Sequence, residues 1–137
     1  MIIGIPKEIK DNEYRVALIP SGAGIFVKAG HKVIIQKSAG IGSGFTDNEY
    51  KDIGAELVDD AKNVYDKSEL IVKVKEPLSA EYPLIKENHI IFTFLHLSAD
   101  KELINALIKT KAVFIAYETV ELEYGSLPIL TPMSEVA

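Results

Sequence analysis

Three residues far apart in the chain, Arg15, Lys75 and His96, are of types that bind anions or transfer protons. Lys75 and His96 each lie towards the carboxyl end of an apolar run with the composition of a buried strand, E-L-I-V-K-V-K-E-P-L and H-I-I-F-T-F-L-H-L. Ligands of open α/β sheets bind outside the carboxyl ends of the strands. A lysine and a histidine delivered there together predict a small anionic substrate and a proton-transfer step.

Each of these residues also has an ordinary structural interpretation. The Arg15 guanidinium can hold a carboxylate through two parallel hydrogen bonds, but a lone arginine near a strand is more often a surface ion pair. Lys75 can place a positive charge beside a carbonyl or carboxylate group, or can reach solvent through its long stem. His96 can exchange protons near neutral pH, or can be a hydrogen-bonded core histidine. The residue types alone leave these alternatives open.

The elements that must position these residues alternate between strands and helices. Further short apolar runs predict buried strands at residues 1–6, 32–36, 56–58 and 111–117. Apolar residues at helical spacing, with caps and terminal glycines, predict helices over residues 20–29, 46–52, 59–65 and 100–109. The alternation predicts a three-layer α/β/α, Rossmann-like (flavodoxin-like) domain whose mainly parallel sheet is covered on both faces.

A glycine-rich loop, S-A-G-I-G-S-G-F-T, follows the predicted strand at residues 32–36. Its spacing, G-x-G-x-G, differs from the G-x-G-x-x-G of dinucleotide-binding loops. It is followed by T-D-N-E at residues 46–49, the pattern of a helix capping box. We therefore expect a tight turn packed near the site and not a phosphate-binding loop.

The overall composition excludes several classes of function. Of 137 residues, 47% are hydrophobic, and the net charge of −5 is offset by no basic stripe, so we expect no nucleic-acid partner. No apolar run approaches the roughly 20 residues of a membrane span, and the amino terminus lacks the pattern of a secretory signal. With no cysteine and no cluster at metal-ligand spacing, we expect no metal site. The expected location is the cytoplasm.

The last residues, T-P-M-S-E-V-A, predict the start of a helix. Thr131 is the expected cap, Pro132 lies in the first turn, and Glu135 lies near the positive end of the helix. A helix of about one turn is marginal in water. We therefore expect residues 1–130 to form one domain, and residues 131–137 to begin a helix that leads to further polypeptide.

Seven segments spread over the whole chain resemble the amino-terminal part of alanine dehydrogenases, of the alanine dehydrogenase/pyridine nucleotide transhydrogenase family. They are M-I-I-G-I-P-K-E-I-K-D-N-E-Y-R-V-A, G-H, the glycine-rich loop, K-V-K-E-P, F-T-F-L-H-L, A-Y-E-T-V and L-P-I-L-T-P-M-S-E-V-A. The transhydrogenase subunit shares the early G-I-P-K-E and R-V-A features. The Y-E-T-V and L-T-P-M-S-E-V-A segments resemble the dehydrogenase instead.

The resemblance implies oxidation of L-alanine to pyruvate and ammonium with NAD, by an enzyme that is a hexamer when complete. It implies that Arg15 and Lys75 hold the substrate carboxylate and carbonyl oxygen, and that His96, with Lys75, is catalytic. By the same resemblance the remaining site residues are Glu118 and Met133 at the substrate and Ser134 near the cofactor. Phe94 occupies a position where the resemblance leads us to expect a tyrosine.

The resemblance also implies parts that the 137 residues do not contain. An NAD-binding domain with a catalytic aspartate would follow the helix that begins at Thr131. The chain is thus expected to be a substrate-side domain that is inactive alone. Two alternatives are a free-standing module that binds pyruvate or a similar small carboxylate, and a domain like the transhydrogenase α subunit or a lysine-pathway dehydrogenase.

Overall fold

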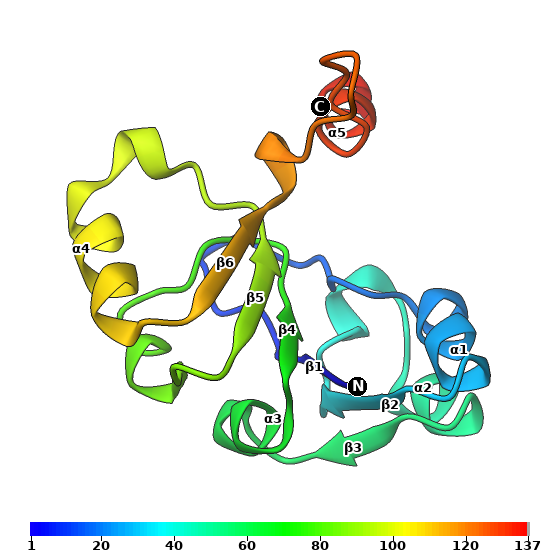
Figure 1. Cartoon of the computed structure of the whole chain (residues 1–137). Helices are drawn as coiled ribbons and strands as arrows, with labels where there is room; N and C mark the ends of the chain where they lie inside the picture. Colours follow the sequence, from blue (N-terminus) through cyan, green and yellow to red (C-terminus); the bar gives the residue numbers. More distant parts are fainter. Residues whose placement is uncertain (137) are drawn as a thin grey trace.

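A parallel sheet forms the centre of the molecule (Figure 1). The structure is a computed structural model that describes residues 1–136. Within them the six strands are β1 (Ile2–Ile5), β2 (Lys32–Gln36), β3 (Glu56–Val58), β4 (Leu70–Val72), β5 (Ile90–Thr93) and β6 (Val113–Ala116). Their order is β3-β2-β1-β4-β5-β6, with every neighbouring pair parallel. This is the Rossmann order of doubly wound sheets, which differs from the flavodoxin order 2-1-3-4-5.

Helices pack on both sides of this sheet. The described α-helices are α1 (Pro20–Lys28), α2 (Asp47–Asp52), α3 (Ala61–Lys67), α4 (Lys101–Thr110) and α5 (Leu130–Val136). Figure 1 shows α1 and α2 on one side and α3 and α4 on the other, and two separate apolar clusters form beneath these pairs. The predicted α/β class and parallel sheet are confirmed. No helix in residues 1–136 is long and apolar enough to cross a membrane.

Successive side chains along each central strand point alternately towards the two clusters. Ile34, Ile71 and Ile91 face α3 and α4, whereas Ile3 and Ile35 face α1 and α2. Each of these isoleucines is at most 2% exposed. β-branched residues fit a pleated surface that is buried on both faces, which explains why these strands are nearly continuous apolar runs in the sequence.

Local signals in the sequence set most of the helix ends. Thr46 caps α2 in a complete capping box with Glu49, and Pro20 is the first residue of α1. Asp100 caps α4, since its side chain accepts a hydrogen bond from the Leu103 N–H. Gly30 follows α1 with φ at +87°, a conformation that costs glycine little.

Two expectations about the end of the chain need correction. β6 is not a buried strand: Val113 is 55% exposed and Ile115 41% exposed. Their register partners on β5, Ile90 and Phe92, are only half-buried. β6 lies at the sheet edge, where the Val113 and Ile115 side chains remain open to solvent. In addition, the final helix begins at Leu130, so Thr131 lies inside the helix and does not cap it; Ala137 lies outside the described residues.

Candidate functional site

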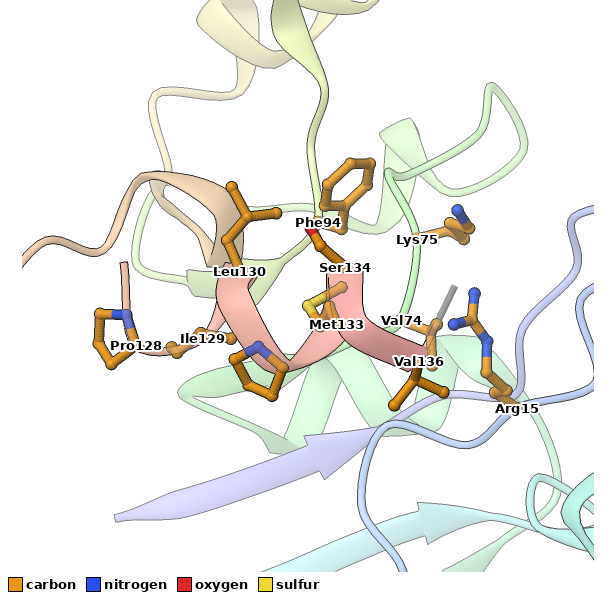
Figure 2. Close-up of a pocket in the computed structure, with 11 residues that line it drawn as sticks. Arg15, Val74, Lys75, Phe94, Pro128, Ile129, Leu130, Met133, Ser134 and Val136 are labelled. Atoms are coloured by element: carbon orange, nitrogen blue, oxygen red, sulfur yellow. The ribbon is translucent and has the colours of Figure 1, made fainter. Parts of the chain in front are cut away.

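A cavity of about 910 Å³ lies beyond the carboxyl ends of the central strands, beneath α5 (Figure 2). Its wall is formed by Arg15, Val74, Lys75, Phe94, Pro128, Ile129, Leu130, Pro132, Met133, Ser134 and Val136. A second cavity of about 320 Å³ is lined by Lys10, Lys75, Glu76, Phe94, Leu95, His96, Ala99, Asp100 and Leu103. Lys75 and Phe94 line both cavities, so the two adjoin along these side chains.

The three residues predicted to do chemistry are distributed over these two cavities. Arg15 and Lys75 share the larger one, where Figure 2 shows them at the same end, away from Pro128. His96 lines the smaller cavity, again with Lys75. The Phe94 ring lies between Lys75 and His96. The Lys75 ammonium lies 5.2 Å from the centroid of this ring, and the centroid of the His96 ring lies 5.8 Å from it in an edge-on arrangement. The structure therefore brings Arg15, Lys75 and His96 into one region but not into one cavity.

Lys75 and His96 do not lie on strands, as the apolar runs had predicted. β4 ends at Val72 and β5 at Thr93, and each of the two candidate residues follows three positions later. Beyond the strand ends, backbone groups form hydrogen bonds with side chains in place of the neighbouring strand. The Thr93 hydroxyl donates to the carbonyl of Lys75, at 2.7 Å. These partners were not visible in the local sequence, which explains why the strand ends were wrong.

The backbone at His96 adopts the left-handed conformation, with φ at 49° and ψ at 46°. Such a conformation costs a residue other than glycine about 1–3 kcal/mol unless its surroundings enforce it. Here the Glu118 carboxylate accepts hydrogen bonds from the amides of His96, at 2.7 Å, and Leu95, at 3.1 Å. Glu118, predicted at the substrate, lines neither cavity and instead holds the turn that presents His96.

Arg15 is oriented by an acid that the sequence had not singled out. Its Nε donates to Glu13 at 2.8 Å and its Nη2 at 2.7 Å, a two-pronged contact. The hydrogen bonds from Arg15 lower the pKa of Glu13 below its usual value. One edge of the guanidinium is thereby occupied, while Nη1 and the second hydrogen of Nη2 stay available to a ligand carboxylate.

The glycine-rich loop packs against the backbone that carries Arg15. The Ser43 hydroxyl accepts a hydrogen bond from the Val16 N–H at 3.2 Å and donates to the Tyr14 carbonyl at 3.1 Å. A Cβ atom at Gly42 would lie only 2.5 Å from that carbonyl oxygen. The expectation of a tight turn packed near the site is therefore confirmed.

Two of the three glycines of this loop, Gly40 and Gly42, are packed against other residues, since a Cβ at Gly40 would lie 2.7 Å from the Tyr50 ring, whereas the space beside Gly44 is open. The sequence contains no glycines at G-x-G-x-x-G spacing.

Ser134, the residue predicted near NAD, lies in the wall of the larger cavity beside Met133. Residues 1–136 also contain no group of three or more side chains arranged to hold a metal ion.

A buried charged network below the site was also missed. The Lys73 side chain is 0% exposed, and its ammonium lies 3.0 Å from Glu8 and 2.9 Å from Glu81. Burial raises the pKa of Glu8 even though the Lys73 charge opposes this. A lysine inside an apolar run signals that a buried acid must exist, because an unpaired buried charge is too costly. Nothing in the sequence says which of the 20 acidic residues it is.

Together, these features define an α/β domain of Rossmann order with a cation-bearing cavity at the strand ends, suited to a small carboxylate. The comparison with known sequences gives the family. The profile described as "Alanine dehydrogenase/PNT, N-terminal domain" matches residues 4–137, and the chain belongs to this family. The resemblance stated from the motifs is thus confirmed.

The relatives show how much of such a protein the chain represents. It is 57% identical over 137 residues to the alanine dehydrogenase of Methanococcus maripaludis and 56% identical to that of Staphylococcus haemolyticus. It spans 37% and 36% of their lengths. A solved L-alanine dehydrogenase superposes with a TM-score of 0.96 at 52% identity, over all of this chain and 38% of the other. A transhydrogenase from Sinorhizobium meliloti gives 0.80 at 25% identity, over 86% of this chain and 34% of the other.

Proposed function

We propose that the chain is the substrate-side part of an NAD-dependent alanine dehydrogenase. The complete enzyme converts L-alanine, NAD and water to pyruvate, ammonium and NADH. The observation that supports this proposal is the presence of Arg15 and Lys75 in one cavity at the strand ends, in a chain whose relatives are named alanine dehydrogenase. Residues 1–130 are assigned to this part, and the helix that begins at Leu130 leads towards the NAD-binding domain.

The roles of the site residues follow from their charges and positions. The free edge of Arg15 binds the substrate carboxylate. Lys75, which forms no ion pair within residues 1–136, binds and polarises the carbonyl oxygen of pyruvate. Met133 and the Phe94 ring supply apolar surface for a methyl group. Glu118 acts on the substrate through the His96 turn.

His96 is the proposed acid/base group. Its imidazole can accept a proton from the attacking water and return it to the departing nitrogen. Bound NAD supplies the hydride acceptor, and polypeptide outside this chain holds most of the cofactor, with Ser134 near it. We infer a cytoplasmic homo-oligomer, a hexamer for the complete enzyme, with no nucleic-acid or membrane partner.

Pyruvate binding to the purified chain tests the proposal. Titration calorimetry or NMR should detect binding, and Arg15→Ala and Lys75→Ala should each weaken it by about tenfold or more, as expected for loss of a charged hydrogen bond. Lys62→Ala is the matched control, because Lys62 pairs with Asp66 on the surface of α3. Unchanged affinity in both site variants would show that the cavity is not the substrate site.

A further inference from the structure

The buried network at Lys73 contains more negative charge than it needs. One ammonium contacts two carboxylates, and the Glu8 and Glu81 side chains are only 3% and 4% exposed. A single carboxylate would balance the lysine. A second buried carboxylate carries a desolvation penalty and repels the first. Its presence therefore calls for a role beyond charge balance.

The two carboxylates differ in what else they bind. Glu81 accepts a hydrogen bond from the Leu78 N–H at 3.0 Å and one from the Tyr65 hydroxyl at 3.3 Å. Its own N–H donates to the Leu78 carbonyl, so Glu81 closes its own turn. Glu8 comes from the loop after β1, and its second oxygen accepts from the Val74 N–H at 2.6 Å. Of these two acids, only Glu8 joins the network to the residue next to Lys75.

The Val74 amide is one of several backbone groups that are held after β4 ends. The Lys73 N–H still donates to the Phe92 carbonyl at 3.0 Å, and the Tyr117 hydroxyl donates to the Lys73 carbonyl at 2.7 Å. Thr93 holds the Lys75 carbonyl. The partner of the Val74 N–H is the Glu8 carboxylate, and a half-buried donor that loses its acceptor is costly, so this contact constrains the backbone directly before Lys75.

We propose that Glu8 is a positioning residue for Lys75. It fixes the Val74 amide and thereby the direction in which Lys75 leaves the backbone, while the Lys73 ammonium holds the Glu8 carboxylate in place. Lys75 then reaches the wall shared by the two cavities, 5.2 Å from the Phe94 centroid. The effect on ligand affinity rests on the proposed function; the effect on Lys75 itself does not.

Glu8→Gln and Glu81→Gln form a matched pair for the test. Each removes one negative charge from Lys73, but only Glu8→Gln disturbs the contact with Val74, because the single oxygen of an amide cannot replace two carboxylate oxygens that each hold one partner. The direct readout is the NMR shift of the Lys75 ε-methylene protons, which the Phe94 ring current displaces. Pyruvate affinity and thermal unfolding are measured on the same samples.

Glu8→Gln should move the Lys75 signal towards the value of a free lysine and weaken pyruvate binding about tenfold, since small displacements of a binding group are costly. Glu81→Gln should lower the unfolding temperature but change the Lys75 signal little and the affinity less than about twofold, because its contacts close its own turn. Equal effects of the two variants on the Lys75 signal, or no effect of Glu8→Gln, would overturn the proposal.

Two further outcomes are distinguishable. If Glu8→Gln does not fold, Glu8→Asp keeps the charge but is one methylene too short to reach both partners, so it should still move the Lys75 signal. An unmoved signal in that variant would also overturn the proposal. If the unsubstituted chain binds no pyruvate, the proposed function fails, and the Lys75 signal still decides the role of Glu8.

Discussion

The cations around the cavities have different electrostatic environments, and the difference bears on which of them meets a ligand. Arg15 shares its guanidinium with Glu13, and Lys73 is buried between two carboxylates. Lys75 faces the Phe94 ring. A cation–π contact is worth about 0.5–2 kcal/mol but neutralises no charge. Lys75 forms no ion pair within residues 1–136, so its ammonium is open to an anionic ligand, whereas one edge of the Arg15 guanidinium is already paired with Glu13.

His89 provides a pH-dependent prediction at the scale of a single residue. It is 1% exposed, its Nδ1 accepts from the Lys86 N–H at 3.0 Å, and its Nε2 lies 2.9 Å from the Tyr65 carbonyl. Only the neutral ring with a proton on Nε2 satisfies both partners. Burial lowers the pKa of His89 in the folded state. The unfolded chain therefore takes up a proton below about pH 6.5 that the folded chain does not.

The stabilisation due to His89 should accordingly be complete above about pH 6.5 and be lost as the pH falls. The slope is at most about 1.4 kcal/mol per pH unit for one proton. Urea unfolding from about pH 8 to about pH 5 should show this loss in the unsubstituted chain but not in His89→Gln. The quantity to compare is the difference in unfolding free energy between the unsubstituted chain and His89→Gln at each pH. Burial raises the pKa of Glu8, so Glu8 makes both proteins less stable as the pH rises, and this contribution cancels in the difference. Parallel curves would contradict the prediction.

At the scale of elements, the residues proposed to do the chemistry lie on loops that follow the strands, and other segments hold these loops. The glycine-rich loop holds the Arg15 segment through Ser43 and through the close approach of Gly42 to Tyr14. The turn at His96 is held by Glu118. Segments distant in sequence thus fix the backbone of each functional residue, which lets exposed side chains such as Arg15 keep a defined direction.

Gly42→Ala should displace Arg15 without straining its own backbone. The new Cβ would lie 2.5 Å from the Tyr14 carbonyl oxygen, so the Tyr14–Val16 segment must move. We expect pyruvate affinity to fall by about an order of magnitude, because displacement of a binding group by roughly 1 Å can cost up to about 100-fold. Calorimetry on the variant measures this effect.

Gly44→Ala is the control in the same loop. Gly44 has φ at +85°, and no heavy atom lies within 4 Å of the position that a Cβ would take, so the substitution strains the backbone but meets no neighbour. It should lower the free energy of unfolding by about 1–2 kcal/mol and leave pyruvate affinity unchanged. The interpretation of Gly42 fails if both variants weaken binding equally.

The sequence predicted elements better than it predicted contacts. Several helix starts are set by local residues, so Thr46 and Pro20 could be recognised directly, and Asp100 was one of two candidate caps with Ser98. The expected cap Thr131 was wrong, because it lies inside α5. The ends of β4 and β5 depend on Glu8 and Glu118, which come from other parts of the chain. The prediction that β6 is buried was wrong for a similar reason. Its V-F-I-A sequence is apolar on both faces of the strand, but whether a face is buried depends on which other segments pack against it.

At the scale of the whole molecule, the strand order explains how the site assembles. β1 and β4 are neighbours although β2 and β3 lie between them in the sequence, and the chain reverses its direction of winding there. The loop after β1 therefore brings Glu8 and Arg15 beside the ends of β4 and β5. Physical reasoning from the sequence placed Lys75 and His96 at strand ends. It did not bring Arg15, Met133 and Ser134 to them; the family resemblance did.

The final prediction concerns catalysis by the chain alone. Hydride transfer requires a cofactor held against the substrate. The glycine-rich loop lacks the G-x-G-x-x-G spacing of a dinucleotide-binding loop, and its Gly40 and Gly42 are packed against Tyr50 and Tyr14. The purified 137-residue chain should therefore bind pyruvate but show no NADH formation from L-alanine and NAD. The alanine dehydrogenase of Methanococcus maripaludis, of which the chain matches 37%, is the positive control under the same conditions. Measurable turnover by the chain would mean that residues 1–137 hold NAD themselves, and that the assignment of the cofactor to other polypeptide is wrong.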